Sequence, residues 1–206
     1  AMGIDLYCIR HSSPGSPQLV HKYSGKPVIN GGDGRHAHPT QALLDIFSIW
    51  ERLGNLKGLK ITIVGDILNS RVVRSDLIGM TKLGMEVTVC GPRTLMPANM
   101  EQIYGCKVEY DLAEALKDAD IVMGLRMQLE RMTEGLFPSL EEYSRHYVLS
   151  KETIKYAKKD ALIMHPGPMN RGIEILPEIA DSAQSIIVEQ VANGVAVRMA
   201  LMFLIL

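Results

Sequence analysis

The chain alternates short apolar runs with helical patterns, and this alternation limits the folds that are open to it. The apolar runs that we predict to be strands are 60–64, 86–90, 107–110, 119–125 and 161–164. Helical spacing separates them, most clearly over 70–83 and 112–117. Strands that alternate with helices build parallel sheets with right-handed crossovers. The sequence therefore predicts an α/β fold with a doubly wound parallel sheet, of the Rossmann kind.

Two further strands are predicted ahead of this sheet. Residues 4–9 are almost continuously apolar, as in a strand buried on both faces, and they end at Arg10-His11. A second apolar run, 27–30, ends in glycines, and a short helix over 17–23 would connect the two strands. Ligands of open α/β sheets lie beyond the carboxyl ends of the strands, so Arg10 and the loop after residue 30 would face one site.

Composition excludes several classes of protein. With 206 residues, 47% of them hydrophobic and 22% charged, the chain can bury a substantial core. A net charge of −1, without a basic run interleaved with aromatics, gives no reason to expect a nucleic-acid partner. No N-terminal basic region precedes a long apolar run, and the apolar segment 199–206 is too short to span a bilayer. We therefore expect a soluble, cytoplasmic protein with no membrane partner.

The three cysteines, Cys8, Cys90 and Cys106, form no Cys-x-x-Cys motif and are odd in number. A disulfide framework is therefore not expected, and a reducing compartment is favoured. We interpret all three as small residues of the core.

The stretch 31–45 joins a predicted strand to a predicted helix. Pro39 suits a first helical turn, and the apolar residues that follow continue with helical spacing over 39–53. His38 and Gln41 are three positions apart and would share one face at the start of this helix. A helix start that carries polar side chains can hold an anion.

Two other interpretations of this stretch stay open. His38 is also compatible with an N-cap role, and Gln41 with a solvated position on the helix. A zinc site formed by Asp33, His36 and His38 is less favoured, because their spacing fits no standard ligand frame.

Gly65-Asp66 follows the first strand of the predicted main sheet, where dinucleotide-binding domains carry a glycine-rich turn. Only one of the three glycines of G-x-G-x-x-G is present, so no nicotinamide cofactor is expected. Arg71 and Arg74 begin the next helix. They are either solvated surface charges or groups that bind a carboxylate with a bidentate fork.

Arg126 and Gln128 follow the strand 119–125, and in an extended backbone they point to the same side. They either face a ligand or form a polar strand exit with ordinary surface ion pairs. The segment 165–168, His-Pro-Gly-Pro, closes the last strand, and its prolines leave carbonyls as the polar groups that it offers. The sequence does not decide whether the Gly167-Pro168 bond is cis or trans.

The end of the chain, 185–206, is predicted to be one helix with an apolar stripe. The stripe consists of Ile187, Val191, Val195, Met199, Met202 and Leu206. Asn193-Gly194 weakens this prediction, because a glycine inside a helix costs about 1 kcal/mol relative to alanine.

Five separated segments resemble aspartate carbamoyltransferase catalytic chains in order and spacing. They are Ile9-Arg10-His11, the stretch 32–45, Gly65-Asp66 to Arg71, the arginine segment 126–131, and the His-Pro-Gly-Pro-Met-Asn-Arg-Gly segment 165–172. The sister family, ornithine carbamoyltransferase, carries a His-Cys-Leu-Pro loop and a Ser-Met-Gly segment, and neither occurs in this sequence.

The resemblance implies transfer of the carbamoyl group of carbamoyl phosphate to the amine of L-aspartate, the committing step of pyrimidine synthesis. The products would be N-carbamoyl-L-aspartate and phosphate, and no cofactor or metal would be needed. By the resemblance, Arg10 and His38 are catalytic residues that hydrogen-bond the carbonyl oxygen of the carbamoyl group.

The other roles follow from the same resemblance. Gln41 would hold the carbamoyl amide together with the backbone carbonyls of Gly167 and Pro168. Arg71 and Arg126 would bind the two carboxylates of aspartate, and Gln128 would assist them.

The family also has an upstream Ser-x-Arg-Thr-Arg loop for the phosphate, which is absent from these 206 residues. We therefore expect an incomplete catalytic chain that is weakly active or inactive alone; the alternative is a non-catalytic binding or assembly module with the same fold. The expected parts are the end of the carbamoyl-phosphate domain (1–37), an interdomain helix (38–53), an aspartate-binding domain (54–184) and a C-terminal helix that packs on the first domain (185–206). The apolar stripe on that helix would then lack much of the surface against which it packs.

The resemblance further implies a homotrimer, with a regulatory chain or a dihydroorotase as further partners.

Overall fold

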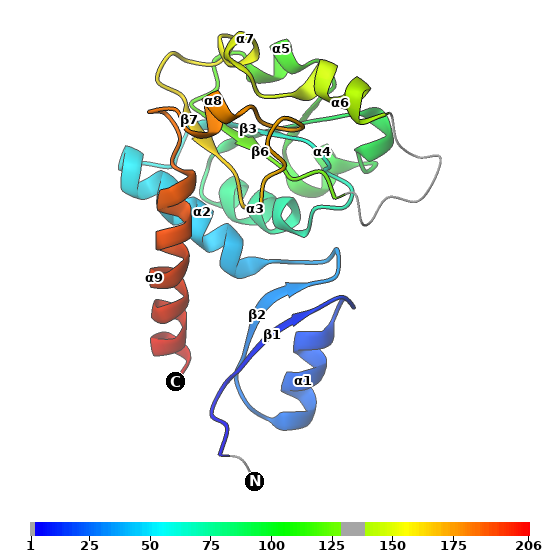
Figure 1. The fold of residues 1–206 in the computed structure, drawn as a ribbon. Coiled ribbons are helices and arrows are strands. Elements are labelled where there is room, and N and C mark those ends of the chain that lie inside the picture. The colour runs from blue at the N-terminus through cyan, green and yellow to red at the C-terminus, as the bar shows by residue number, and fades with distance from the viewer. Residues whose placement is uncertain (1–2, 129–138) are drawn as a thin grey trace.

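The computed structural model describes residues 3–128 and 139–206. Its larger part is a five-stranded, fully parallel sheet in the order β5-β4-β3-β6-β7 (Figure 1). The strands are β3 (Lys60–Val64), β4 (Glu86–Cys90), β5 (Lys107–Glu109), β6 (Ile121–Gly124) and β7 (Leu162–Met164). The chain proceeds from β3 to one edge of the sheet and then returns to the other side through β6 and β7. The predicted doubly wound sheet is confirmed.

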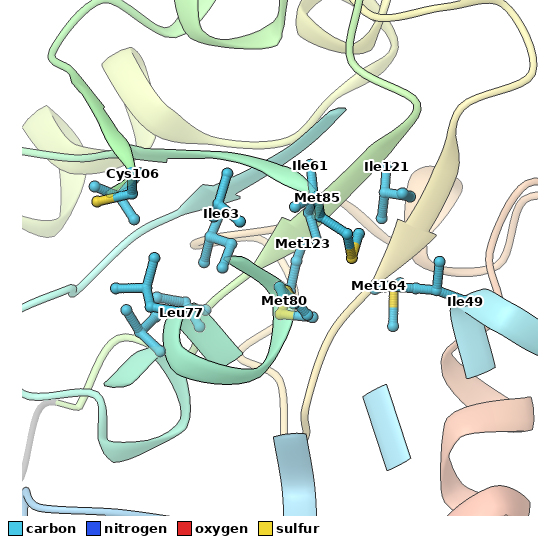
Figure 2. Close-up of a cluster of buried hydrophobic side chains, with 14 of the residues drawn as sticks. Ile49, Ile61, Ile63, Leu77, Met80, Met85, Cys106, Ile121, Met123 and Met164 are labelled. Carbon is cyan, nitrogen blue, oxygen red and sulfur yellow. The ribbon is translucent and has the colours of Figure 1, made fainter. Parts of the chain in front are cut away.

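Helices cover both faces of this sheet, because alternate residues of its strands point to opposite sides. In β6, Ile121 and Met123 join one buried cluster, whereas Val122 joins another. Figure 2 shows the first cluster, in which strand residues such as Ile61 and Ile63 lie close to Leu77 and Met80 of a helix. The described elements of this domain outside the strands are α3 (Arg71–Lys82), a 3₁₀ turn η1 (Arg93–Leu95), α4 (Met100–Tyr104), α5 (Leu112–Leu116), α6 (Leu140–Tyr147), α7 (Lys151–Ile154) and α8 (Pro177–Ala180).

A separate two-stranded unit precedes the sheet and corrects part of the sequence prediction. Strand β1 (Tyr7–His11) pairs in parallel with β2 (Val28–Asp33), and α1 (Ser16–Ser24) connects them as predicted. β1 starts three residues later than expected and includes Arg10. It is not buried on both faces, and Cys8 is exposed rather than in the core. An apolar run reveals a preference for burial, but it does not reveal which neighbour covers the strand.

Helix α2 (Pro39–Leu53) has the predicted bounds. Proline stands at its first position, and Gly54 ends it in a left-handed conformation with φ 70°. The helix lies between the two-stranded unit and the main sheet, and it contacts both α3 and the last helix of the chain (Figure 1). It therefore places the loop before Pro39 against the sheet domain.

The last helix, α9 (Ile187–Ile205), packs against α2, and the two helices cross at an angle (Figure 1). Its buried face differs from the predicted apolar stripe, of which Ile187 alone is buried, whereas Val191 is 71% exposed. The face against α2 instead carries Asn193 and Gly194. A β-carbon at Gly194 would lie 3.2 Å from Cδ2 of Leu44, so the glycine allows the two helices to approach closely.

Asn193 contacts α2 through hydrogen bonds rather than through apolar packing. Its Nδ2 donates to Oγ of Ser48 at 3.1 Å and to Oε2 of Glu51 at 2.8 Å. The Asn-Gly pair that weakened the helix prediction therefore lies in the contact between α9 and α2 and contributes to it. Among the described helices, α9 is also the one that is long and apolar enough to cross a membrane by length and composition. The apolar segment is thus longer than the residues 199–206 that the sequence singled out.

Candidate functional site

A pocket of about 260 Å³ opens where the main sheet, α2, α9 and the two-stranded unit meet. All eight residues for which a site role was predicted border it: Arg10, His38, Gln41, Arg71, Arg126, Gln128, Gly167 and Pro168. Five further residues border it that the sequence did not indicate: Ser70, Val72, Leu125, Pro166 and Arg198. The structure therefore brings the predicted residues together, while their chemical roles stay predictions.

Strand ends supply most of this lining, as the position of ligand sites in open α/β sheets predicts. Arg126 and Gln128 follow β6, and Met127 between them is fully buried, so the two polar side chains share the pocket side. Asn170, after β7, donates from its Nδ2 to the carbonyl of Met127 at 3.2 Å and ties the two segments together. Positions 129–131 of the matched arginine segment lie outside the described residues.

The loop before α2 is held by a buried carboxylate, Asp33. It accepts hydrogen bonds from the backbone N–H of Gly15 (2.8 Å), from Asn30 Nδ2 (2.9 Å) and from His36 Nδ1 (3.0 Å). Burial raises the pKa of Asp33, but these hydrogen bonds outweigh burial, and the net shift is downward. Strand β2 continues through the glycines to Asp33, which pairs with His11 of β1, beyond the point where the sequence indicated that the strand would end.

The zinc interpretation of this loop has no support in the geometry. Asp33 binds His36, whereas His38 lies 3.5 Å from Arg10 through its Nε2. Residues 3–128 and 139–206 contain no cluster of three or more histidine, cysteine or acidic side chains that could hold a metal ion.

His38 occupies the N-cap position of α2, but its side chain caps nothing and borders the pocket instead. Its Nδ1 lies 3.3 Å from the hydroxyl of Thr40. Burial, and then the positive charges of Arg71, Arg10 and Arg198, lower the pKa of His38 to about 3. The imidazole is therefore neutral at physiological pH.

Arg71 is the first residue of α3 and only 8% exposed, so the surface-charge interpretation is wrong for it. Its Nη1 donates to the carbonyl of Gly34 at 3.4 Å, and its guanidinium lies against Gly32. The Oγ of Ser70 accepts a hydrogen bond from the N–H of Val73 and caps the helix that presents Arg71. Arg74, by contrast, is half-buried and does not border the pocket.

The turn after β7 also lines the pocket. The Gly167-Pro168 bond is cis, which settles the alternative that the sequence left open. The N–H of Gly167 donates to Nδ1 of the buried His165 at 3.0 Å. That bond fixes the turn whose Pro166, Gly167 and Pro168 face the pocket.

Of the five lining residues without a predicted role, Arg198 is the charged one. It is the single charged residue between 190 and 206, and its Nη1 donates to the carbonyl of Gly194, one turn earlier, at 2.8 Å. A lone arginine in an apolar helix is the signal that could have drawn attention to it. Its place in the pocket depends on how α9 packs on α2, which no local pattern encodes.

The pocket is strongly electropositive. Four guanidinium groups border it, and none of the described lining residues is acidic. Arginines at a partly desolvated site bind carboxylates and phosphates with paired hydrogen bonds. The arrangement therefore suits a ligand with more than one negative charge.

Comparison with known families agrees with this geometry. Residues 57–205 match the model of the aspartate/ornithine carbamoyltransferase Asp/Orn binding domain. The chain belongs to the aspartate/ornithine carbamoyltransferase family. Residues 1–51 match the carbamoyl-P binding domain of the same family.

Within this family, the chain is similar over its whole length to aspartate carbamoyltransferase catalytic subunits. It is 57% identical to that of Moorella thermoacetica over 206 residues, which is all of this chain and 67% of that protein. It is also 57% identical to that of Acetivibrio thermocellus over 204 residues, 99% of this chain and 65% of that protein. The chain thus spans about two thirds of the length of these carbamoyltransferases.

Solved carbamoyltransferases of both branches share the fold. The ornithine carbamoyltransferase of Pyrococcus furiosus superposes with a TM-score of 0.85 at 30% identity, covering 97% of this chain and 66% of that one. The aspartate transcarbamoylase of Trypanosoma cruzi in complex with phosphate also gives a TM-score of 0.85, at 25% identity, covering 98% and 67%.

Proposed function

We propose that this pocket serves the transfer of a carbamoyl group from carbamoyl phosphate to the α-amine of L-aspartate. The products are N-carbamoyl-L-aspartate and phosphate, as in the de novo synthesis of pyrimidines. The observation that carries the proposal is the convergence of Arg71 and Arg126 with Arg10, His38 and Gln41 on one pocket. Relatives at 57% identity that are named aspartate carbamoyltransferase support the choice of aspartate over ornithine.

The two carboxylates of aspartate bind Arg71 and Arg126 in this proposal, and Gln128 assists. Two fixed cations match a dicarboxylate, whereas they would repel the second amine of a diamine such as ornithine. Both arginines follow strands of one rigid sheet, so they fix the position of the substrate amine. Holding the amine next to the carbonyl carbon contributes the proximity part of catalysis.

Arg10 and His38 hydrogen-bond the carbonyl oxygen of the carbamoyl group. Without a ligand, Arg10 Nη1 donates to Nε2 of His38 at 3.5 Å, so Nε2 accepts and the proton of the neutral ring is on Nδ1, 3.3 Å from the Thr40 hydroxyl. When carbamoyl phosphate binds, the ring proton moves to Nε2 and the Thr40 hydroxyl donates to Nδ1, so that Arg10 and His38 become two donors directed at one oxygen. Such donors stabilise the oxyanion that develops when the amine attacks.

We assign the remaining roles in the same way. Gln41 and the backbone carbonyls of Gly167 and Pro168 hold the carbamoyl amide, and the reaction uses no cofactor or metal. We also propose the division into a carbamoyl-phosphate portion (1–37), an interdomain helix (38–53), an aspartate-binding domain (54–184) and a terminal helix (185–206). A cytoplasmic homotrimer completes the proposal.

The test is the formation of N-carbamoylaspartate by the purified 206-residue chain with millimolar carbamoyl phosphate and aspartate. We expect weak turnover, because the chain contains no Ser-x-Arg-Thr-Arg segment for the phosphate. Arg71→Ala should abolish it, whereas Arg52→Ala should not, because Arg52 is exposed and pairs with Glu189 at 3.6 Å.

Calorimetric titration with succinate distinguishes the alternative function. Succinate binding that Arg71→Ala removes, without turnover even when the upstream carbamoyl-phosphate domain of a relative is supplied separately, would identify a binding module rather than an incomplete enzyme. A folded chain that neither turns over nor binds succinate would contradict both functions.

A further inference from the structure

A buried chain of hydrogen bonds leads from the turn after β7 to the pocket. The backbone N–H of His165 donates to Oε1 of Gln190 at 3.0 Å. Nε2 of Gln190 donates to Oδ1 of Asp45 at 2.7 Å, and Nε2 of Gln41 donates to the same oxygen at 3.0 Å. These four residues are at most 7% exposed, so water does not compete for their hydrogen bonds.

The backbone N–H of His165 fixes the direction of this series of hydrogen bonds. A backbone N–H is a donor only, so the amide of Gln190 must turn its oxygen toward His165 and its nitrogen toward Asp45. Oδ1 of Asp45 then accepts from Gln190, and the second N–H that reaches it comes from Gln41. Oε1 of Gln41 is the amide atom left for the pocket.

The same series of hydrogen bonds also connects two walls of the pocket. His165 precedes the turn that presents the backbone of Gly167 and Pro168, and Gln41 stands on α2. Gln190 bridges them from α9, two turns before Arg198. The acceptor on α2 and the carbonyls of the turn are therefore held in one frame by buried side chains.

We propose that Asp45 and Gln190 are positioning residues that turn the oxygen of Gln41 toward the pocket, so that the site selects a ligand amide over an isosteric methyl group. This inference rests on the proposed function, because it specifies how that site distinguishes the carbamoyl group from an acetyl group. A reversed Gln41 would set its own NH₂ against the NH₂ of the ligand. The pocket would then lose the distinction between the two groups.

Asp45 and Gln190 do not border the pocket, so any effect of their substitution on ligand choice must pass through Gln41. A purely structural role would change stability or the affinity for all ligands together. A positioning role changes the ratio of affinities for two ligands that differ in a single group. That ratio is the quantity to measure.

The first measurement is hydrogen exchange of the side-chain NH₂ groups by NMR in the unliganded chain. Both protons of a glutamine NH₂ group are in fast exchange with water unless they are buried and bonded. We expect slow exchange for Gln41 and Gln190 and fast exchange for the exposed Gln18 and Gln102. Fast exchange at Gln41 would overturn the proposal without any reference to ligand binding.

The second measurement compares the calorimetric affinities of phosphonoacetamide and of acetonylphosphonate, which carries CH₃ in place of NH₂. We expect the wild-type chain to prefer the amide by about tenfold, the factor of a single hydrogen bond. Gln190→Met and Asp45→Leu should bring the ratio close to one. Asp45→Asn should keep the preference, because it retains Oδ1 and changes only Oδ2, which has no hydrogen-bond partner among the described residues.

Gln184→Met is the matched control. Gln184 is a structural glutamine that donates to the carbonyls of Lys159 and Ala161 at 3.1 and 2.9 Å, and it does not border the pocket. It should leave the ratio unchanged even if it lowers stability. A folded Gln190→Met or Asp45→Leu variant that keeps the tenfold preference would overturn the proposal, as would equal wild-type affinity for the two probes. If neither probe binds the wild-type chain, the carbamoyl part of the proposed function fails, and the exchange rates of Gln41 alone decide the orientation.

Discussion

The guanidinium of Arg71 lies directly against the backbone of Gly32, so closely that a β-carbon on Gly32 would come within 2.8 Å of Cζ of Arg71. Gly32 also has φ +116°, a conformation that side chains rarely adopt. The end of strand β2 therefore limits where Arg71, an arginine of the sheet domain, can be placed.

Gly32→Ala should displace Arg71 and weaken succinate binding by at least about tenfold, or ~1.4 kcal/mol. Calorimetric titration measures the affinity, and urea unfolding measures the stability that the strained φ costs. Gly25→Ala is the control, because Gly25 has φ +65° but open space around its β-carbon position. Equal losses of succinate affinity in the two variants would contradict a specific effect on Arg71.

Arg126→Ala should weaken succinate binding by about 2–5 kcal/mol, the cost of removing one partner from a desolvated charge pair. The affinity is measured by calorimetry at constant salt. Arg145→Ala, an exposed arginine of α6 away from the pocket, should leave it unchanged. An unaltered affinity in Arg126→Ala would remove Arg126 from the dicarboxylate site.

His38 should stay neutral throughout the physiological range, because burial and three arginines lower its pKa to about 3. Its imidazole Cε1–H resonance should not move between pH 8 and about pH 5. The unfolded chain takes up a proton at the ordinary value of 6.5, so the neutral ring stabilises the fold above that pH, and the contribution is lost as the pH falls toward 3. Arg198→Met should raise the pKa of His38, whereas Arg52→Met should not. A His38 resonance that titrates near pH 6.5 in the wild type would contradict the assignment.

Asp45 should give the opposite dependence on pH. Burial raises the pKa of Asp45 from 3.8 to about 7, although hydrogen bonds from Gln190 and Gln41 and the charge of Arg198 act in the opposite direction. Burial and the nearby Asp45 also raise the pKa of Asp76 well above its ordinary value. The folded state then binds a proton that the unfolded state has released, so stability is lost as the pH rises from 3.8 to about 7. The slope is at most about 1.4 kcal/mol per pH unit for one proton.

Urea unfolding across this pH range measures that slope. Asp45→Asn should flatten it and make the chain more stable at pH 8 than the wild type. Because His38 contributes a slope of the opposite sign between pH 3 and 6.5, the test is the difference between the two proteins: an Asp45→Asn variant with the same slope as the wild type would contradict the assignment.

Local sequence patterns predicted the elements that lie inside the main sheet and helix α2, because proline, glycine and periodic apolar residues mark their ends. They predicted less well where the neighbour of an element decides its environment. The strand around Cys8 is exposed although it is apolar, and α9 buries Asn193 and Gly194 rather than its apolar stripe. Arg198 borders the pocket, and Gln190 contacts Asp45, because two helices that are distant in sequence pack together.

The pocket takes Arg10 from the first strand of the chain and Arg198 from its last helix. Contacts between segments so far apart in sequence are costly to form early in folding, because closing long loops costs entropy before such contacts stabilise the fold. A partly folded chain can therefore contain a formed sheet and still have no pocket. A ligand stabilises only the state that it binds, so its binding reports that the segments around Arg10 and Arg198 have both folded.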